Sequence, residues 1–513
     1  MSMKECRLIL GDQLNENHSW FHTVSPNTFY LFVEADSEVR YVRHHIQKVK
    51  AIFMGMKAFA KSLVEKGHIV EYIELNQKDN QKSISANVIQ FCQKRKIDKF
   101  SYQLPDEYRL DLELQNLCKI LNEKGVQTEA YDTEHFLSPR DSFKTIFPKK
   151  SYRMENFYRY MRKQYNFMLD SSGEPWGGQW NFDAMNRKKY DGKIKIPSRK
   201  WKPSYSDEVL QRIPRKWTMG EMPTEGIIWP ITRKEALNRL DEFLEIFLDG
   251  FGDYQDAMLE ESPYLFHSCL SFALNVKLIS PKEVIERAIR TYEKKRNQIS
   301  LSNLEGFVRQ ILGWREFTRG LYWAEMPSYQ TLNHLEHQRE LPSWYWTGET
   351  KMNCMSYSIR QSLHLAYAHH IQRLMVIGNF SLLYGVNPDE LDKWYLGIYI
   401  DAFEWVEITN TRGMSQFADG GKIASKPYVS SANYIDKMSN YCKNCAYDKK
   451  TKSEVNSCPY NSLYWHFFDR HKKILEKNPR IGMVYHTWGK MNSAEKKRIL
   501  ARANWILENG ESL

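Results

Sequence analysis

The sequence predicts an N-terminal α/β domain built on a Rossmann-like parallel sheet, a long connector, and a large all-α C-terminal domain. Two observations carry this prediction. Strand-like and helical runs alternate over residues 5–131, and strand signals fade from about residue 231 onward, where helical spacing dominates. A chain of 513 residues with 42% hydrophobic residues has enough apolar material for two or three cores. We expect the α/β domain at residues 1–137, the connector at 138–230 and the helical domain at 231–513.

The N-terminal alternation indicates βαβ units on a parallel sheet. Strand-like runs cover residues 6–10, 28–34, 68–75 and 99–104, and helical runs lie near residues 42–66, 83–94 and 110–124. No Gly-x-Gly-x-x-Gly follows the first run, so the dinucleotide fingerprint is missing. Instead the first run leads to Asp12, and the second ends in Glu34 and leads to Glu38. Carboxylates beyond strand ends predict a small-ligand crevice; helix capping by Asp12 and a surface charge at Glu38 are the alternatives.

The connector and the net charge of +11 favour a polyanionic partner. Residues 138–225 hold Pro, Gly, Lys and aromatic residues without a sustained period, which is typical of a connector. Within it, residues 152–165 and 180–189 interleave aromatic and basic side chains, so rings could stack on bases while cations hold the backbone. A solvated basic linker is the alternative.

The helical half contains a predicted helix start at Ser302, where Glu305 three residues later completes a capping box. The following apolar positions recur at helical spacing and predict one buried face: Leu304, Phe307, Val308, Ile311 and Leu312.

Four cysteines in this half predict a metal centre. Cys442, Cys445 and Cys458 form Cys-x2-Cys-x12-Cys-Pro, and Cys354 brings the thiols to the four that a zinc ion or an iron–sulfur cluster requires. The Cys-Pro pair and the lack of His between residues 442 and 458 favour the cluster, but spacing leaves both open. The other cysteines are isolated in apolar stretches and are expected to pack in cores. Without a signal pattern or an apolar run of roughly 18 residues, we expect a cytoplasmic protein with no membrane partner.

Six short motifs are spread over nearly the whole chain: LGDQL (10–14), YVRHH (41–45), GGQWNFD (177–183), GWREF (313–317), AHHIQR (368–373) and GMSQFADGG (413–421). With the four cysteines they resemble cryptochromes and photolyases, and among these the bacterial iron–sulfur branch that includes the prokaryotic (6-4) photolyases. This resemblance implies an antenna-chromophore domain followed by a helical FAD domain, and a [4Fe-4S] cluster on the cysteines. It also implies a monomer whose partner is UV-damaged DNA.

The resemblance further implies light-driven repair, in which excited, fully reduced FAD donates an electron to a pyrimidine (6-4) photoproduct flipped out of the duplex. His369 is then the proton donor, because imidazole gives and retakes a proton near neutral pH. His369 and His370 are consecutive on an apparent helix, so their side chains point about 100° apart, and one faces a pocket while the other packs. Tyr428 is a lesion neighbour. A structural role for either histidine is the alternative.

Two segments are similar to flavin-binding segments of the family. Residues 267–271 (HSCLS) are similar to a Thr-Ser-x-Leu-Ser phosphate loop, which assigns Ser268, Leu270 and Ser271 to FAD and puts His267 where Thr is usual. Arg373, one turn after His369, is within reach of a phosphate or of the same pocket.

The second segment, residues 401–407, is similar to an Asp-x-Asp-x-x-x-Asn run. Asp401 is kept, Phe403 replaces the second Asp, and Glu407 stands at the Asn that lies near flavin N5. A carboxylate there would change the stability of reduced flavin forms. A solvated helix face is the alternative for these acids.

Further roles rest on the same resemblance. Trp394, Tyr395 and Trp346 correspond to an electron relay from surface to flavin, and Tyr434, like Tyr428, is a lesion-pocket or redox neighbour. Asp12 and Glu38 correspond to contacts of an antenna chromophore, in this branch 6,7-dimethyl-8-ribityllumazine. Three connector cations would bind the lesion strand: Arg187, Lys188 and Lys189.

Three other readings remain open at this point. A signalling cryptochrome would share the cofactors without repair. A four-cysteine zinc protein that binds DNA through a non-photochemical mechanism would contain no flavin. A repair enzyme for cyclobutane dimers is disfavoured only by the resemblance of the His-His motif.

Overall fold

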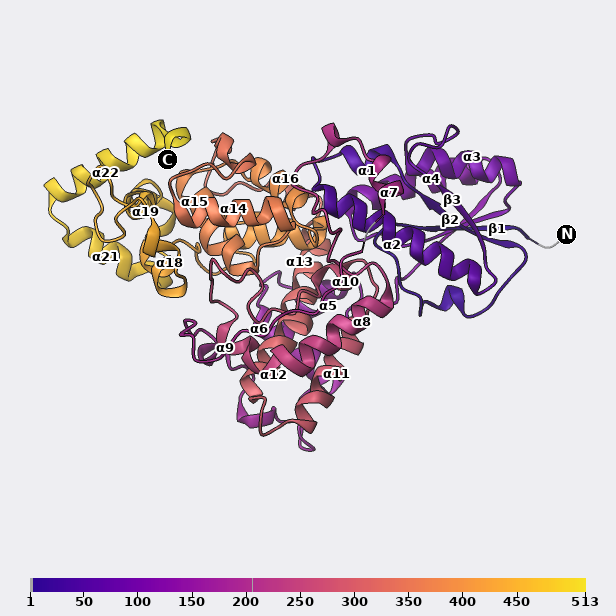
Figure 1. Ribbon diagram of the computed structural model, residues 1–513, viewed down its shortest axis with the longest axis horizontal. Coiled ribbons are helices and arrows are strands. Elements are labelled where there is room, and N and C mark those ends of the chain that lie inside the picture. Colours follow the sequence, from indigo (N-terminus) through magenta and orange to yellow (C-terminus); the bar gives the residue numbers. More distant parts are fainter. Residues whose placement is uncertain (1–2, 205) are drawn as a thin grey trace.

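The computed structural model describes residues 3–204 and 206–513 and places a parallel sheet at the N-terminal end of the chain. The five strands lie in the order β3-β2-β1-β4-β5, all parallel, and the rest of the chain is mainly helical, as predicted (Figure 1). The strands are β1 (Glu5–Ile9), β2 (Thr28–Val33), β3 (Ile69–Ile73), β4 (Lys99–Gln103) and β5 (Gln127–Tyr131).

The four strand-like runs and the three helical runs of the N-terminal region form where they were expected. The helices there are α1 (Asp36–Arg40), α2 (Ile46–Glu65), α3 (Ile84–Arg95) and α4 (Tyr108–Glu123). Strand β5 was missed, because its sequence QTEAY is polar and mostly exposed at the sheet edge. Helix α2 begins at Ile46 rather than near residue 42, since the His45 ring accepts a hydrogen bond from the Gln47 backbone (3.2 Å) and caps it.

The connector contains α5 (Ser142–Ile146), α6 (Met154–Tyr165) and α7 (Asp207–Gln211). Helix α6 packs against the segment around residues 309–315, and Phe157 and Tyr158 are fully buried in that contact. The expectation that the rings of residues 152–165 stack on nucleic acid is therefore wrong for these two. The interleaved pattern has a helical period, so one face of α6 is core and only the other is free for a partner.

The C-terminal domain is built from α8 to α22, which Figure 1 shows as a lower lobe, a central group and an outer group. The helices are α8 (Arg233–Glu242), α9 (Leu248–Tyr254), α10 (Ser271–Asn275), α11 (Pro281–Lys294), α12 (Leu301–Val308), α13 (Glu316–Glu325), α14 (Asn353–Leu365), α15 (Asn379–Tyr384), α16 (Pro388–Ile398), α17 (Glu404–Ile408), α18 (Ala432–Met438), α19 (Pro459–Arg470), α20 (Lys472–Leu475), α21 (Gly482–Lys490) and α22 (Ser493–Glu508). Four π-helical segments interrupt them: Phe243–Phe247, Arg309–Arg315, Gln372–Gly378 and Thr409–Ser415.

The predicted capping box on Ser302 is wrong by two residues. Helix α12 begins at Leu301, and the Ser300 hydroxyl accepts the capping hydrogen bond from the Asn303 backbone (3.2 Å). Glu305 is instead buried in an ion pair with Arg309 (3.1 Å). The five apolar positions of this stretch are all buried, so the predicted core face is confirmed.

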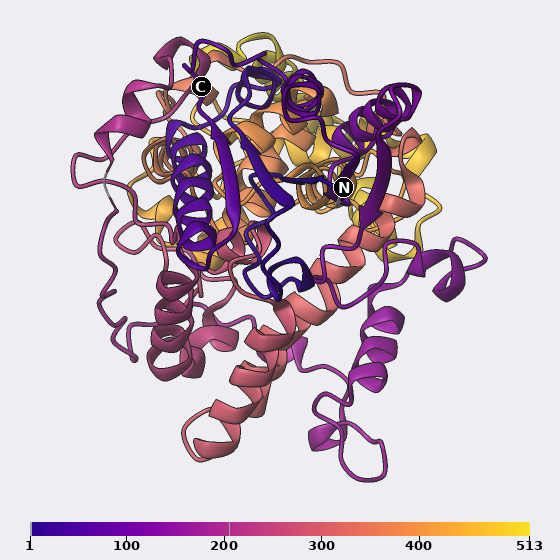
Figure 2. The same ribbon diagram turned by 90° about the vertical axis from the view of Figure 1, so that its right-hand side faces the viewer.

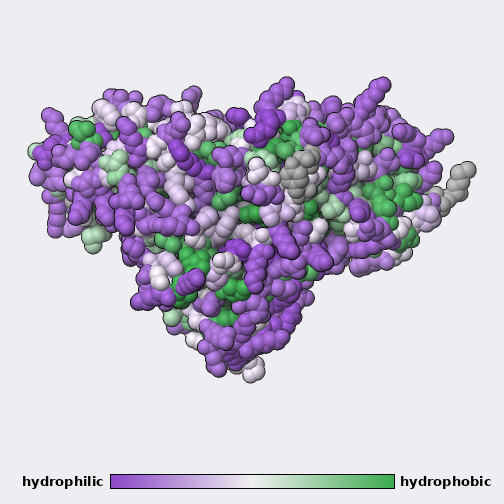
Figure 3. All heavy atoms as spheres, in the orientation of Figure 1, coloured by the Kyte–Doolittle hydropathy of each residue, from purple (hydrophilic) through white to green (hydrophobic). Residues whose placement is uncertain are grey.

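The sheet domain lies directly against the central helices, and Figure 2 shows it in front of them. The His45 backbone donates to Gly397 O (2.9 Å) on α16, and the Tyr322 hydroxyl on α13 accepts from the Tyr108 backbone (2.7 Å). Polar side chains cover most of the face in Figure 3, with apolar atoms gathered in small patches. No helix within residues 3–204 and 206–513 is long and apolar enough to cross a membrane.

Candidate active site and metal centre

Three predicted flavin residues meet around one carboxylate. Asp401, in the loop between α16 and α17, lies 2.6 Å from the Ser271 hydroxyl at the start of α10, and 3.0 Å from the Arg373 guanidinium in the π-helical segment Gln372–Gly378. The Asn275 side chain adds a bond to the Asp401 backbone oxygen (2.8 Å). Residues about 130 positions apart in the chain thus form one polar cradle. Ser268 is half-buried on the loop before α10, whereas Leu270 is buried and can offer only its backbone or apolar surface.

Glu407, on α17, has a buried carboxyl and follows Asp401 closely in the chain. Its pKa is raised well above the usual 4.5 by burial and by the neighbouring Asp392 carboxylate. Its Oε1 atom has no hydrogen-bond partner among the described residues. A buried carboxyl with an unused oxygen is suited to bond a polar ring atom of a ligand.

The two histidines face different surroundings. His369 precedes the helix rather than lying within it; its ring is 3% exposed and stacks on His267 (centroids 4.5 Å apart, planes 20° apart). Neither His369 ring nitrogen has a partner in the described part of the chain. His370 is the first residue of the helix and is exposed. One ring packs and the other is accessible, and the accessible ring belongs to His370 rather than to His369.

Electrostatics keep both rings neutral as they stand. Burial, followed by His267, His370 and Arg373, lowers the pKa of His369 well below 6.5. His370 is reachable by solvent yet closely surrounded by protein atoms, and this burial, together with Arg373 and His267, lowers its pKa to about 4. An anion bound next to His370 would raise its pKa again, because it would stabilise the imidazolium.

A second polar group joins the connector to the C-terminal helices. Arg187 forms an ion pair with Asp183 and lies close enough to Tyr428 and Tyr434 to lower their pKa values, which burial raises. Burial also raises the pKa of Asp256 to about 6, against the effect of Arg187. The structure therefore brings together three residues that were predicted to contact the lesion or its strand.

The other two predicted DNA cations lie nearby in sequence and are both exposed. Lys188 pairs with Asp253 (2.9 Å), and Lys189 lies on the surface next to it.

The predicted relay residues are only partly in contact. Trp394 is buried and its ring lies 5.5 Å from Tyr395, whereas Trp346 is 41% exposed. The ring beside Trp394 on the side of the Trp346 segment is Tyr345 (5.3 Å), which stacks on Trp344 (4.8 Å). Sequence reasoning missed these two rings, although the run SWYW at residues 343–346 contains them.

The four predicted metal-site cysteines line one cavity. Cys354 is in the first turn of α14, Cys442 and Cys445 flank a short turn, and Cys458 immediately precedes α19. Burial and the neighbouring thiol and Asp436 raise the pKa of Cys442 to about 11, so thiolates here need a positive centre to offset their charge. Within the described residues, no three His, Cys, Asp or Glu side chains are grouped closely enough for a single metal ion.

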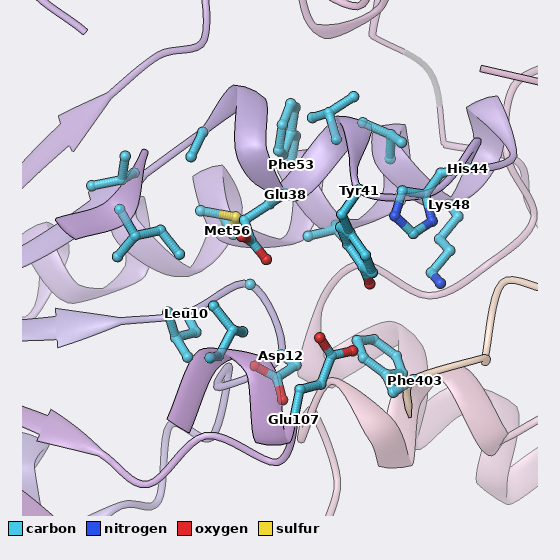
Figure 4. Close-up of a pocket in the computed structure, with 18 of the residues that line it drawn as sticks. Leu10, Asp12, Glu38, Tyr41, His44, Lys48, Phe53, Met56, Glu107 and Phe403 are labelled. Carbon is cyan, nitrogen blue, oxygen red and sulfur yellow. The ribbon is translucent and has the colours of Figure 1, made fainter. Parts of the chain in front are cut away.

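A pocket opens at the carboxyl ends of β1 and β2 and beside the residues that follow β4, where the strand order reverses (Figure 4). It has a volume of about 860 Å³, counting the space open to solvent. Both predicted antenna residues line it: Asp12 binds Lys277 (3.1 Å), and Glu38 makes two bonds to Arg109 (2.9 and 2.7 Å).

Glu34, the third carboxylate of the predicted crevice, lies outside this pocket. It is fully buried and accepts bonds from Tyr72 (2.8 Å) and Arg212 (3.0 Å), so it holds the fold together.

Sequence reasoning also missed the side of the pocket nearest the helical domain, which is lined by Tyr41, His44, Lys48 and Phe403. Figure 4 shows Lys48 and Phe403 at the same end of the pocket. Lys48 donates to the backbone oxygens of Leu396 (2.8 Å) and Ala402 (2.5 Å), and burial lowers its pKa to about 8. The motif YVRHH contains two of the missed residues and is the signal that could have found them.

Comparison with known proteins finds a relative that matches over nearly the full chain. Residues 7–224 match the family described as deoxyribodipyrimidine photo-lyase-related protein. Over 510 residues the chain is 39% identical to a protein of Agrobacterium fabrum named (6-4) photolyase, with 98% of each chain covered.

Two solved structures share the fold at low identity. A bacterial class III photolyase from Agrobacterium tumefaciens superposes with a TM-score of 0.60 at 16% identity, over 99% of this chain and 98% of that one. A cryptochrome from Synechocystis sp. PCC6803 superposes with a TM-score of 0.56 at 12% identity, over 98% of both chains.

Proposed function

The chain belongs to the cryptochrome/photolyase family, and from this premise we propose that it is a light-driven DNA repair enzyme that acts on pyrimidine (6-4) photoproducts. The observation that carries the proposal is full-length identity of 39% to a protein named (6-4) photolyase. Its support in the structure is that the residues assigned to flavin binding meet around Asp401 and the four cysteines assigned to the metal line one cavity.

We propose that FAD binds at the cradle formed by Ser271, Arg373 and Asp401, with Ser268 and Leu270 along the preceding loop. Bound FAD would supply the light-driven electron. The Asp401 carboxylate holds Arg373 in place, and the buried Glu407 carboxyl, whose pKa is raised, can bond a ligand where the family places flavin N5. The Asp401–Arg373 ion pair and the Glu407 carboxyl together suit a polar, partly anionic ligand.

His370, rather than His369, is the proton donor in this proposal. A donor must reach the lesion, and the His369 ring is enclosed beneath His267 whereas His370 is open to solvent. The flanking DNA phosphates would raise the lowered pKa of His370 toward neutrality and so allow it to hold a proton. His369 then keeps His267 and the helix start in position.

UV-damaged DNA binds, in this proposal, across the connector and the lower helical lobe. Arg187 lies with Tyr428 and Tyr434, so a flipped lesion could stack on the rings while the cation contacts its phosphate, and Lys188 and Lys189 extend the contact. The substrate suits a monomer that works in the cytoplasm on the cell's DNA.

The four cysteines would hold a [4Fe-4S] cluster. Their thiols surround a cavity instead of converging on one point, which suits a body larger than a single ion. Iron and acid-labile sulfide in the purified protein would support this, and one zinc per chain would contradict it.

The pocket at the sheet edge would hold the antenna, and 6,7-dimethyl-8-ribityllumazine is the proposed ligand. Asp12 and Glu38 line a cavity of suitable size for a bicyclic ring, and their carboxylates can accept bonds from ribityl hydroxyls.

Light-dependent repair of a defined (6-4) oligonucleotide tests the function. We expect repair in blue light, no repair in the dark, a loss of at least 100-fold in His370→Ala, and a loss of less than tenfold in His369→Ala, with FAD retained in both. Loss in His369→Ala together with full activity in His370→Ala would return the donor role to His369. A flavin protein that photoreduces normally but repairs no lesion would instead be a signalling cryptochrome.

A further inference from the structure

A closed set of buried hydrogen bonds lies behind the two histidines. Gln361 on α14 and Gln372 in the π-helical segment pair through their carboxamides: each donates to the other's side-chain oxygen, at 3.1 and 3.0 Å. Gln361 also donates to the Tyr367 backbone oxygen (3.1 Å). The Gln372 oxygen accepts a bond from the His369 backbone (3.0 Å). Both glutamine side chains are buried, so the bonds form away from water.

The same set reaches the metal site through Tyr441. Gln372 donates its second hydrogen to the Tyr441 hydroxyl (2.9 Å). Tyr441 lines the cavity of the four thiols and directly precedes Cys442. The Asn353 side chain, next to Cys354, donates to the Tyr441 backbone oxygen (2.9 Å). Tyr441 is therefore fixed by the Cys442 segment, to which it belongs, and by the Cys354 segment, through Asn353.

The geometry leaves no carboxamide donor unused. Gln361 makes two donor bonds and Gln372 makes two, which accounts for all four of their N–H groups. Apolar side chains could fill this space without that cost, because a buried polar network loses stability when any member is left without its hydrogen bond. Such a network specifies one arrangement of the segments it joins, and here these are the metal site and the helix start at His370.

The Gln372 side chain links movement at Tyr441 to movement of the helix start at His370. Its oxygen caps the backbone N–H of His369, and its own residue is the third of the helix that begins at His370. Movement of the Tyr441 hydroxyl would change the position of Gln372, and Gln372 determines how the chain enters this helix. His370 and Arg373 both depend on that entry.

We propose that Gln372 and Tyr441 are positioning residues that couple the four-cysteine metal centre to His370. The centre acts through them by holding the helix start, and thereby the accessible imidazole, in its repair geometry. This inference rests on the proposed function only for the role of His370; the coupling itself concerns the folded protein in the dark.

The first test needs neither light nor a lesion. Protein loaded with flavin and iron is treated with diethyl pyrocarbonate in the dark, and carbethoxylation of His370 is followed by peptide mass spectrometry. We expect the rate to rise at least threefold in Tyr441→Phe and in Gln372→Met, because the helix start is released. The matched control is Tyr357→Phe, whose ring lies against Tyr441 (5.3 Å) but whose hydroxyl bonds Glu260 outside the network.

The second test measures coupling between the two residues. With iron and flavin contents and lesion-DNA affinity within twofold of the wild type, we expect the maximal repair rate to fall about tenfold in Gln372→Met and several-fold in Tyr441→Phe. Adding Tyr441→Phe to Gln372→Met should cost nothing more, because the hydroxyl acts only through Gln372.

Three outcomes would overturn the proposal: an unchanged His370 reaction rate in both variants, the same rise in Tyr357→Phe, or additive losses in the double variant. If the wild type repairs no (6-4) lesion, the proposed function fails, but the carbethoxylation test still decides the coupling. Iron lost from Tyr441→Phe would not obscure the result, because Gln372→Met leaves every residue of the cysteine cavity in place.

Discussion

Single residues in this protein show their roles through what they leave unsatisfied. Buried polar atoms are normally paired, so each exception needs a reason. Among the described residues, Glu407 Oε1 and both ring nitrogens of His369 have no partner, and both residues belong to segments assigned to the flavin and lesion sites. Asp401 shows the opposite case, since two side chains converge on its carboxylate.

Replacing Asp401 by Asn should weaken FAD binding at the proposed flavin site. The change leaves the Arg373 guanidinium without its buried counter-charge and replaces the charged acceptor of Ser271 by an amide. We expect FAD to bind at least tenfold more weakly, which is a loss of about 1.4 kcal/mol of binding free energy. Equilibrium dialysis with flavin fluorescence measures it. Asp79→Asn, an exposed site in the sheet domain, is the control, and equal FAD affinity in both variants would contradict the cradle.

At the scale of elements, the ends and interruptions of helices carry the chemistry. The π-helical segment Gln372–Gly378 contains Arg373, and the segment Thr409–Ser415 begins just after Glu407, in keeping with the tendency of such segments to occur at functional sites. The start of α2 joins the two domains, because the His45 ring lies 2.8 Å from the backbone oxygen of Leu363, in the last turn of α14, while it accepts from Gln47.

Acid should loosen this junction at His45. One ring nitrogen donates to Leu363 and the other accepts from the Gln47 N–H, so the neutral ring is satisfied and a second proton would oppose a donor. Burial, with smaller effects of Arg215 and His364, lowers the folded-state pKa to about 4. The unfolded chain, with a pKa near 6.5, binds the extra proton between pH 6.5 and 4, so stability falls as pH falls through that window.

The expected loss from His45 alone is about 3 kcal/mol between pH 6.5 and 4, at about 1.4 kcal/mol per pH unit. Urea unfolding at several pH values measures it. His45→Asn keeps a capping acceptor without titrating, and its stability should fall less steeply with acid than that of the wild type. His22→Asn, at an exposed position, is the control. Parallel pH profiles for His45→Asn and the wild type would rule out this contribution.

In the whole molecule, the pocket of the sheet domain and the flavin cradle share one boundary. Phe403 closes the pocket two residues after Asp401, and Lys48 reaches from α2 to the backbone of Ala402 between them. A chromophore in the pocket would therefore lie close to the flavin cradle, which is what transfer of excitation energy requires. The two domains build this arrangement together, and neither contains it alone.

Neutralising the two pocket carboxylates, Asp12 and Glu38, should abolish binding of the proposed antenna, the second chromophore, and leave FAD binding unchanged. We expect the double variant Asp12→Asn/Glu38→Gln to lose at least nine-tenths of the second chromophore after expression in a host that makes it, because the ligand's donors lose their charged acceptors. FAD content should stay within twofold. Spectra of the released cofactors give both values, with the exposed Glu123→Gln as control. Unchanged content of the second chromophore would place it elsewhere.

Local patterns in the chain are enough to predict several features of the fold and of the cysteine site. The alternation over residues 5–131 predicts four of the five strands and their helices, and the spacing of Cys442, Cys445 and Cys458 predicts a shared site. Strand β5 was missed because an edge strand needs few apolar residues. The cap of α12 was misplaced because Ser300 and Ser302 are both capping residue types, and only folding shows that Asn303 donates to Ser300.

Which side chains are accessible and which are paired depends on contacts that form only in the folded protein. Nothing in AHHIQR tells His369 from His370, because the ring that covers His369 comes from residue 267, and Gln372 bonds residues 361 and 441. Likewise Asp401 meets Ser271 only through folding. Burial and hydrogen bonding depend on neighbours far away in the chain, so a local pattern can name a candidate residue but not the environment that sets its chemistry.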